Sequence, residues 1–137
     1  MTQTKQTTQM VNWNTLPREF VRDGVERCGF RGENLICVMN YASPGMQVRP
    51  HSHTFEQLVM IVAGRARYHV GDQVFDCEPG SMLRVPPQVM HYIEPVGDDV
   101  VLNLDIFSPL RDDYRHLVEY QAAEFAPEPI ATTEAAA

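Results

Sequence analysis

The sequence predicts an all-β protein that forms one sandwich or barrel. Short runs rich in Val, Ile, Leu, Phe and Tyr recur at near-regular intervals, and Gly, Pro, Asp and Ser turn signals separate them. A chain of 137 residues can bury one core but not two. Helical spacing of apolar residues is found in one stretch, close to the C-terminal end. We therefore expect a single β-domain with a short C-terminal helix.

Each expected strand ends at a turn signal. Ser43-Pro44-Gly45 follows the first run, Gly71-Asp72 follows the third, and Ser108-Pro109 follows the last. Runs of this length, bounded in this way and rich in β-branched and aromatic residues, favour strands over buried helices. The expected strands cover residues 35–41, 57–64, 66–70, 74–77, 82–85 and 100–107.

The helix and the two chain ends complete the predicted organisation. Between about 112 and 123, one helical face collects four residues, Tyr114, Leu117, Val118 and Gln121. Residues 1–10 are rich in Thr and Gln and are expected to be flexible. The tail 126–137 contains two prolines and a terminal Ala run, and is expected to be disordered. The segment 11–125 is then the single domain.

The charge balance limits the class of partner. The formal net charge is -7 and the pI is about 5.1, whereas a surface for nucleic acid or an anionic membrane needs clustered Lys and Arg, which this sequence lacks. Three cysteines without a C-x-x-C pair favour a reducing compartment over a disulfide framework. We see neither a signal-peptide pattern nor a transmembrane run, so we expect a cytoplasmic protein that acts on a small-molecule substrate.

Three histidines indicate a metal site. His51 and His53 are two residues apart, so on a strand both rings project to the same face. His91, expected to end a later strand, can supply a third ligand from an adjacent strand. Imidazole is the commonest protein ligand for zinc, iron, nickel and manganese near neutral pH. The competing interpretation, a hydrogen-bonded core histidine, explains one such residue better than three at this spacing.

Strand parity selects further side chains for this site. If the run 47–61 is one unbroken strand, Arg49 and Gln57 share the face of the two histidines. Polar groups that face a barrel interior imply a hydrated or metal-filled cavity, because unpaired buried polar groups are costly. Gln57 is then the expected fourth ligand, whereas Glu56 points outward unless a bulge intervenes. Arg49 can bind a substrate anion through a two-bond contact.

The last expected strand supplies a second polar set. Alternation within 100–107 puts Leu102, Leu104 and Ile106 on one face, and Asn103, Asp105 and Phe107 on the other. The second face is expected to turn toward the cavity, with Asp105 held at its mouth. The alternative for Asp105 is a structural carboxylate that caps a turn.

These motifs resemble those of the cupins over residues 25–107. The second cupin motif includes Gly80, Pro86 and His91, and Gln88 stands where that motif has a glycine. The resemblance implies a double-stranded β-helix, the jelly-roll or cupin barrel, that holds one divalent metal, either Zn, Ni, Mn or Fe. Dimers are common among such barrels, so a homodimer is expected. The first motif is met by Gly45, His51, His53, Gln57 and Gly64, with Gln57 in place of the usual acidic ligand.

A narrower resemblance is to the small KdgF-type cupins, which ketonise unsaturated uronates. The segment from Asp105 to Arg111 reads Asp-Ile-Phe-Ser-Pro-Leu-Arg and is similar to an element that follows the last strand of those proteins. The resemblance implies that Asp105 moves the proton, that Phe107 shapes the pocket and that Arg111 binds the substrate carboxylate. Val59 and Met60 stand where such cupins tend to have Gly and Tyr, which predicts a more apolar substrate pocket.

The neutral ligand set favours one class of chemistry. Three imidazoles and an amide leave a divalent ion its full charge, so it can polarise a carbonyl or enolate oxygen while Asp105 moves a proton. The sequence thus predicts an isomerase, tautomerase or lyase of a small enolisable carboxylate or ketone. An Fe(II)-dependent dioxygenase of a small aromatic or diketone and a non-enzymatic ligand-binding cupin remain alternatives. Arg111 has an alternative too, a surface ion pair with Asp112, Asp113 or Glu119.

Overall fold

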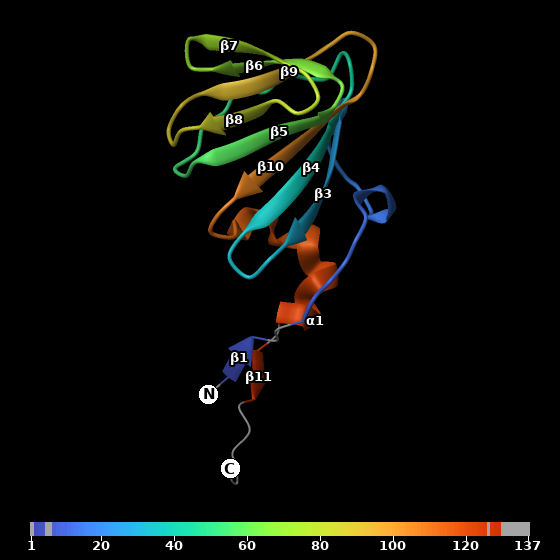
Figure 1. Cartoon of the computed structure of the whole chain (residues 1–137), viewed down its shortest axis with the longest axis vertical. Helices are drawn as coiled ribbons and strands as arrows, with labels where there is room; N and C mark the ends of the chain where they lie inside the picture. The colour runs from blue at the N-terminus through green and yellow to red at the C-terminus, as the bar shows by residue number, and fades with distance from the viewer. Residues whose placement is uncertain (1, 5–6, 126, 130–137) are drawn as a thin grey trace.

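The computed structural model describes residues 2–4, 7–125 and 127–129 and forms a jelly-roll β-barrel (Figure 1). The larger of its two barrel sheets has six strands in the order β2-β3-β4-β10-β5-β8, and the smaller has the order β7-β6-β9. The predicted all-β fold with a short C-terminal helix is therefore confirmed. The six strands are β2 (Glu19–Arg22), β3 (Val25–Arg31), β4 (Ile36–Ala42), β10 (Val101–Phe107), β5 (Gln57–Ala63) and β8 (Met82–Val85).

The smaller sheet forms the opposite wall of the barrel (Figure 1). It contains β7 (Gln73–Cys77), β6 (Arg65–Val70) and β9 (His91–Val96), and every neighbouring pair in both barrel sheets is antiparallel. Strand β9 begins at His91, which corrects the expectation that this histidine ends a strand. A further pair, β1 (Thr2–Thr4) with β11 (Pro127–Pro129), lies near the two chain ends.

Three strands of the barrel were not among the expected runs. They are β2, β3 and β9, and each mixes charged residues, glycine or proline with apolar ones. Intrinsic preference for strand is weak in such segments, so their pairing partners decide the conformation. The run 47–61 is also not one strand, because β5 begins at Gln57 and only an isolated bridge at His51 precedes it.

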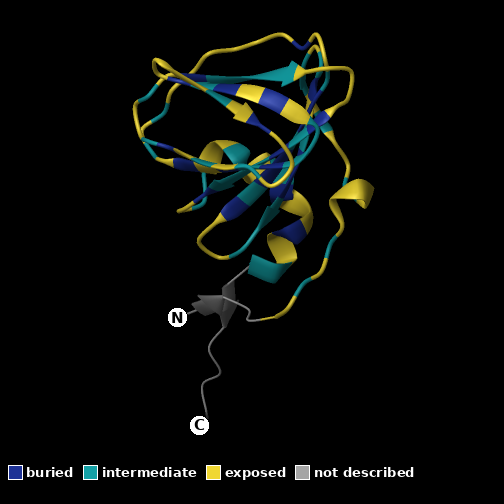
Figure 2. Cartoon of the chain, turned by 45° about the horizontal axis from the view of Figure 1, so that its top comes forward, coloured by how far each residue is buried: buried dark blue, intermediate teal, exposed yellow. Residues whose placement is uncertain are grey.

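The six-stranded sheet has two distinct faces. Gln57, Val59 and Ile61 of β5 point inward and are buried, whereas Leu58 is exposed on the outer face. The same alternation in β10 buries Asn103 and Phe107 against the barrel interior, as the sequence predicts. Figure 2 shows this alternation of buried and exposed positions along the strands. The core between the two sheets includes Val25, Val59, Ile61, Tyr68, Val85 and Val101.

Gly64 connects the two sheets where the chain passes from β5 to β6. Its φ is +79°, and a Cβ built there would lie 2.8 Å from the carbonyl oxygen of Val100. An L-residue would meet both a strained backbone and a steric clash at this position. The glycine of the first motif is therefore explained by close backbone packing beside β10.

The C-terminal helical segment closes one end of the six-stranded sheet (Figure 1). It consists of a 3₁₀ segment, η2 (Asp112–Gln121), with non-helical dihedral angles at Val118, and a turn of α-helix, α1 (Ala122–Phe125). The buried Gln121 accepts a hydrogen bond from the backbone N–H of Arg31 and donates one to its carbonyl. This side chain thus satisfies the end of β3, which would otherwise leave unpaired groups.

The chain ends precede and follow this domain. A short 3₁₀ turn, η1 (Trp13–Thr15), packs near the outer face of the main sheet, with Leu16 against the buried Cys28 and Met39. The tail predicted to be disordered, 126–137, lies outside the described residues except for β11, and the prediction for 1–10 likewise concerns residues that are described only in part. Within the described ranges, no helix has the length and apolar character needed to cross a membrane.

Candidate metal centre and its cavity

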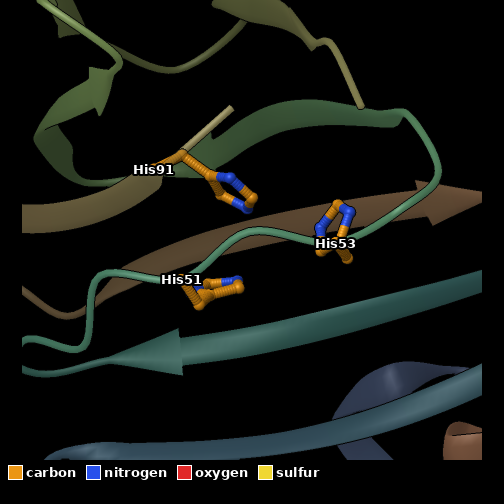
Figure 3. Close-up of side chains that lie close together, drawn as sticks. All are labelled: His51, His53 and His91. Atoms are coloured by element: carbon orange, nitrogen blue, oxygen red, sulfur yellow. The ribbon is translucent and has the colours of Figure 1, made fainter. Parts of the chain in front are cut away.

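His51, His53 and His91 converge at one point of the barrel (Figure 3). One ring nitrogen from each lies within 4.8 Å of the others. The convergence follows from the backbone, because His51 and His91 form an antiparallel bridge with N···O distances of 3.1 and 2.8 Å. Residues opposite each other in such a bridge project their side chains to the same side.

Backbone carbonyls fix the tautomers of the three imidazoles. The Nδ1 atoms lie 3.0, 2.7 and 2.9 Å from the carbonyl oxygens that follow or precede them by two residues. Each Nδ1 must therefore donate, and each Nε2 keeps its lone pair. The Nε2 of His91 is buried and has no hydrogen-bond partner among the described residues. An unpaired buried acceptor of this kind fits a metal ligand.

His53 and Gln57 supply a second sign of a cation site. The Nε2 of His53 and the Oε1 of Gln57 are 3.0 Å apart. With the Nδ1 proton of His53 donated to Phe55, both atoms are acceptors, and two acceptors at this distance repel unless a cation or a proton lies between them. A divalent ion bound by all four side chains would satisfy both atoms together with the Nε2 of His91.

Gln57 is held in the orientation that a ligand needs. Its Nε2 donates to Asp105 at 2.8 Å and to the hydroxyl of Tyr68 at 3.3 Å. Because the amide nitrogen is committed to these two acceptors, the amide oxygen faces the histidines. The structure thus places Gln57 beside the cluster, and places Glu56 in an exposed ion pair with Arg84.

Burial favours the neutral form of His91 and His51. Desolvation lowers the pKa of His91 to about 4, and it also lowers the pKa of His51 below its usual value. Neighbouring imidazoles and Arg111 act in the same direction. Since only neutral imidazole can bind a metal, the cluster is ready to do so at neutral pH.

Asp105 lies next to this centre and accepts three amide hydrogen bonds. Its Oδ1 accepts from Gln57 at 2.8 Å and from Asn103 at 2.6 Å. Its Oδ2 accepts from Asn40 at 2.9 Å. Burial raises the pKa of Asp105 to about 7, and these hydrogen bonds act against that rise. The side chain lines the interior of the cavity rather than capping a turn.

A cavity of about 360 Å³ opens beside the histidines. Its size suits a small-molecule ligand. The buried Asn103 lines it, and the Oδ1 of that residue has no hydrogen-bond partner within the described part of the chain. Polar and apolar side chains share the wall, among them Val21, Ala42, Met46, Gln57, Tyr68, Tyr92, Ile93, Phe107 and Tyr114.

Arg111 forms an ion pair, which was one of the interpretations that the sequence left open, and it also lines the cavity. Its guanidinium binds Asp113 through Nε at 3.0 Å and through Nη2. It also stacks on Phe107 at 4.6 Å and on Tyr114 at 4.0 Å from the ring centroids, and it lines the cavity. The contacts with Asp113 use one edge of the guanidinium, so the Nη1 group is left for a ligand.

Of the remaining residues that were expected to contact the substrate, Arg49, Val59 and Met60, only one lines the cavity. Arg49 lines the cavity and is exposed. Val59 and Met60 do not line it, which corrects the sequence-based expectation: Val59 is packed in the core at 1% exposure, and Met60 is on the outer face beside Met82. Two adjacent strand residues cannot share a face, so at most one of them could have pointed inward.

Several cavity residues were missed by the sequence analysis. Tyr68, which hydrogen-bonds Gln57, and Asn40, which hydrogen-bonds Asp105, occupy expected strands, and parity within those strands could have found them. Arg22 and Arg27 lie on β2 and β3, which the sequence did not predict, so no signal placed them in the site. Burial raises the pKa of Tyr68 well above its usual value, so its hydroxyl stays protonated.

Comparisons with known proteins agree with this geometry. The profile of the AraC-like ligand binding domain family matches residues 36–121. No curated protein sequence matches the chain. KdgF from Halomonas sp. is similar in structure, with a TM-score of 0.70 and 24% identity over 78% of this chain and 98% of its own. An RmlC-like cupin from Shewanella frigidimarina has a TM-score of 0.69 and 22% identity, over 80% and 98%.

A larger protein shares the same barrel. Oxalate decarboxylase from Bacillus subtilis, which has Mn(II) centres, matches with a TM-score of 0.63 and 17% identity. The match covers 80% of this chain and 33% of that protein. These structural likenesses establish the cupin fold, and the three-histidine group of this chain fits a divalent metal.

Proposed function

The chain belongs to the AraC-like ligand binding domain family, and on that premise we propose that it is a metal-dependent isomerase or tautomerase of a small enolisable carboxylate or ketone. One observation carries the proposal. A ligand set without formal charge and a carboxylate meet in one cavity, and the Gln57–Asp105 hydrogen bond of 2.8 Å joins them. This pairing suits a reaction in which negative charge develops on an oxygen while a proton moves.

His51, His53, His91 and Gln57 would hold the metal. When bound, a divalent ion stabilises negative charge on a carbonyl or enolate oxygen. Because the four side chains are neutral, they would leave that ion its full charge. Their orientation is set in advance by the backbone carbonyls and by the amide contacts of Gln57.

Asp105 would move the proton. Its Oδ1 accepts two amide hydrogen bonds, whereas its Oδ2 accepts one, from Asn40. The Oδ2 atom therefore keeps the capacity to take a proton from a substrate carbon and return it to another position. Arg111 would bind the substrate carboxylate through Nη1 while the rings of Phe107 and Tyr114 hold the guanidinium in place.

The test is an activity assay on metal-loaded protein. Unsaturated monouronates are tried first, by loss of the absorbance of their conjugated double bond, and enolisable aromatic acids second. Asp105→Asn keeps the shape of the side chain but removes its proton transfer, so turnover should fall roughly 10²- to 10⁴-fold at unchanged metal content. Asp72→Asn, at an exposed turn, is the matched control. Equal turnover in Asp105→Asn and the parent would refute the assigned role.

A second candidate function is supported by the matched family itself. The family is one of ligand-binding domains, and a cavity of about 360 Å³ can bind a small acid without converting it. Under this alternative the metal-loaded protein binds the test acids but converts none of them. Oxygen consumption with Fe(II) and a catechol or diketone, unchanged by Asp105→Asn, would instead support a dioxygenase.

A further inference from the structure

Four arginines line the cavity of this acidic protein. Two of them have acidic partners. Arg27 binds Glu19 at 2.7 Å, and Arg111 binds Asp113 through two nitrogens. These acidic partners offset part of the positive charge of the two arginines, but the contacts with Asp113 do not use the Nη1 group of Arg111.

Arg22 and Arg49 differ from Arg27 and Arg111 in their partners. Neither forms an ion pair with an acid within the described part of the chain. The Nε of Arg22 donates to the carbonyl of Gln47 at 2.7 Å. Burial lowers the pKa of Arg22, and the positive charges of Arg49 and Arg27 lower it further. Like charges crowded in this way are costly unless an anion binds between them.

The two side chains lie close to the candidate metal centre. The carbonyl oxygen of Arg49 accepts from the Nδ1 of His51 at 3.0 Å, and the charge of Arg22 acts on the same imidazole. Arg111 acts on it too, from the end of β10. Arg22 donates to Gln47, in the loop that carries Arg49, so these two arginines form one position in the cavity. Arg111, which stacks on Phe107 and Tyr114, forms a second position.

We infer that the cavity binds a dianion, with one anionic group at Arg111 and a second at Arg22 and Arg49. The ligand class is a small dicarboxylate, because planar guanidinium groups bind carboxylates through two parallel hydrogen bonds. This inference rests on the proposed function only in treating that dicarboxylate as the substrate. Arg111 alone would require a ligand with one carboxylate, whereas the inferred ligand has two.

The test compares dicarboxylates with monocarboxylates of equal chain length. Malonate, succinate and glutarate are titrated into metal-loaded protein by calorimetry, against propionate, butyrate and valerate. At least one dicarboxylate should bind roughly tenfold or more tightly than its partner, because a charge-assisted pair at the second position is added. Arg22→Gln and Arg49→Gln should each remove most of that difference.

A matched control is available on β6. Arg65 is exposed, lacks an acidic partner among the described residues and does not line the cavity, so Arg65→Gln should bind as the parent does. Arg49→Lys, which keeps the charge, should recover part of the preference. Metal content and melting temperature are recorded for every variant. Because Arg49 is exposed, its variants should perturb folding less than those of Arg22.

Two outcomes overturn the inference. The first is a parent protein that binds no dicarboxylate better than its monocarboxylate. The second is a preference that survives in the Arg22→Gln, Arg49→Gln double variant, which would assign it to chelation of the metal. Failure of the proposed function alone would give another result. Turnover would be absent, but the preference for dicarboxylates that depends on Arg22 and Arg49 would remain.

Discussion

The side-chain amide of Gln57 joins the candidate metal centre to Asp105, to which it donates a hydrogen bond of 2.8 Å. One end of this amide faces His53 and the other end faces the carboxylate. A glutamate has no N–H to donate, so it could serve the metal but not the hydrogen bond to Asp105. The geometry thereby explains why an amide stands where cupins usually have an acidic ligand.

Gln57→Glu should therefore destabilise the metal-free protein more than the metal-bound protein. It places a second carboxylate against Asp105 in a buried site, and we expect a loss of about 2–4 kcal/mol in unfolding free energy. A divalent metal should restore stability more strongly than in the parent, because the new carboxylate attracts it. Melting curves with and without metal measure both effects, with Gln73→Glu on exposed β7 as the control. Equal melting temperatures of the metal-free variant and parent would contradict the packing described.

The three histidines should hold about one divalent metal per chain. His51→Ala combined with His53→Ala removes two of the four donors, so elemental analysis should find the metal lost. His69→Ala combined with His116→Ala is the matched control, since those rings pair with Glu94 and Glu19 outside the cluster. Retention of metal in the first double variant would place the site elsewhere.

The stability of the metal-free protein should fall in mild acid. Burial lowers the pKa of His91 to about 4, so between about pH 6.5 and 4 the unfolded chain binds a proton that the folded chain does not. Unfolding free energy then decreases as the pH falls through this window. His91→Gln cannot take up that proton, so its melting temperature should change less between pH 7 and 5. An identical pH dependence in His91→Gln would be evidence against this cause.

Gln88 occupies a backbone conformation that favours glycine. Its φ is 68°, and its N–H donates to the carbonyl of His53 at 2.8 Å. Gln88→Gly removes the strain of a left-handed residue and adds freedom to the unfolded chain, so we expect a net gain of about 0.5–1 kcal/mol. Chemical denaturation measures it, and Gln73→Gly, which has no positive φ, should destabilise. A loss of stability in Gln88→Gly would show that the side chain has contacts that outweigh the strain.

The expected homodimer remains a prediction, and we propose the outer face of the six-stranded sheet as its interface. Met82 is 67% exposed there, next to Met60 and close to Leu58. Light scattering should give twice the 15.6 kDa mass of one chain. Met82→Glu should yield a monomer, whereas Val74→Glu, at an exposed position of β7, should not. A parent protein of single-chain mass would refute the dimer.

Local pattern was enough to predict much of the site. The spacing of His51 and His53 and the alternation of Asn103, Asp105 and Phe107 depend on neighbours within one strand or loop. The six expected strands have the same origin, since each is apolar enough to be recognised alone. The parity argument for Gln57 assumed one unbroken strand over 47–61, which the structure does not contain, because β5 begins at Gln57. The third histidine of the candidate site, His91, was predicted by the spacing of a second motif, and its bridge to His51 brings the two side chains to one side.

The remaining strands and cavity residues depend on pairing between distant segments of the chain. The strands β2 and β3 are too mixed in composition to be recognised alone, yet they bring Arg22 and Arg27 to the cavity. The orientation of Gln57 depends on Asp105, which is 48 positions away in sequence. Sequence by itself determined which residue types are available and which strand face each one takes. Only the tertiary structure decided which faces meet, because the charge and hydrogen bonding of the cavity depend on side chains from many strands and loops that are distant in sequence.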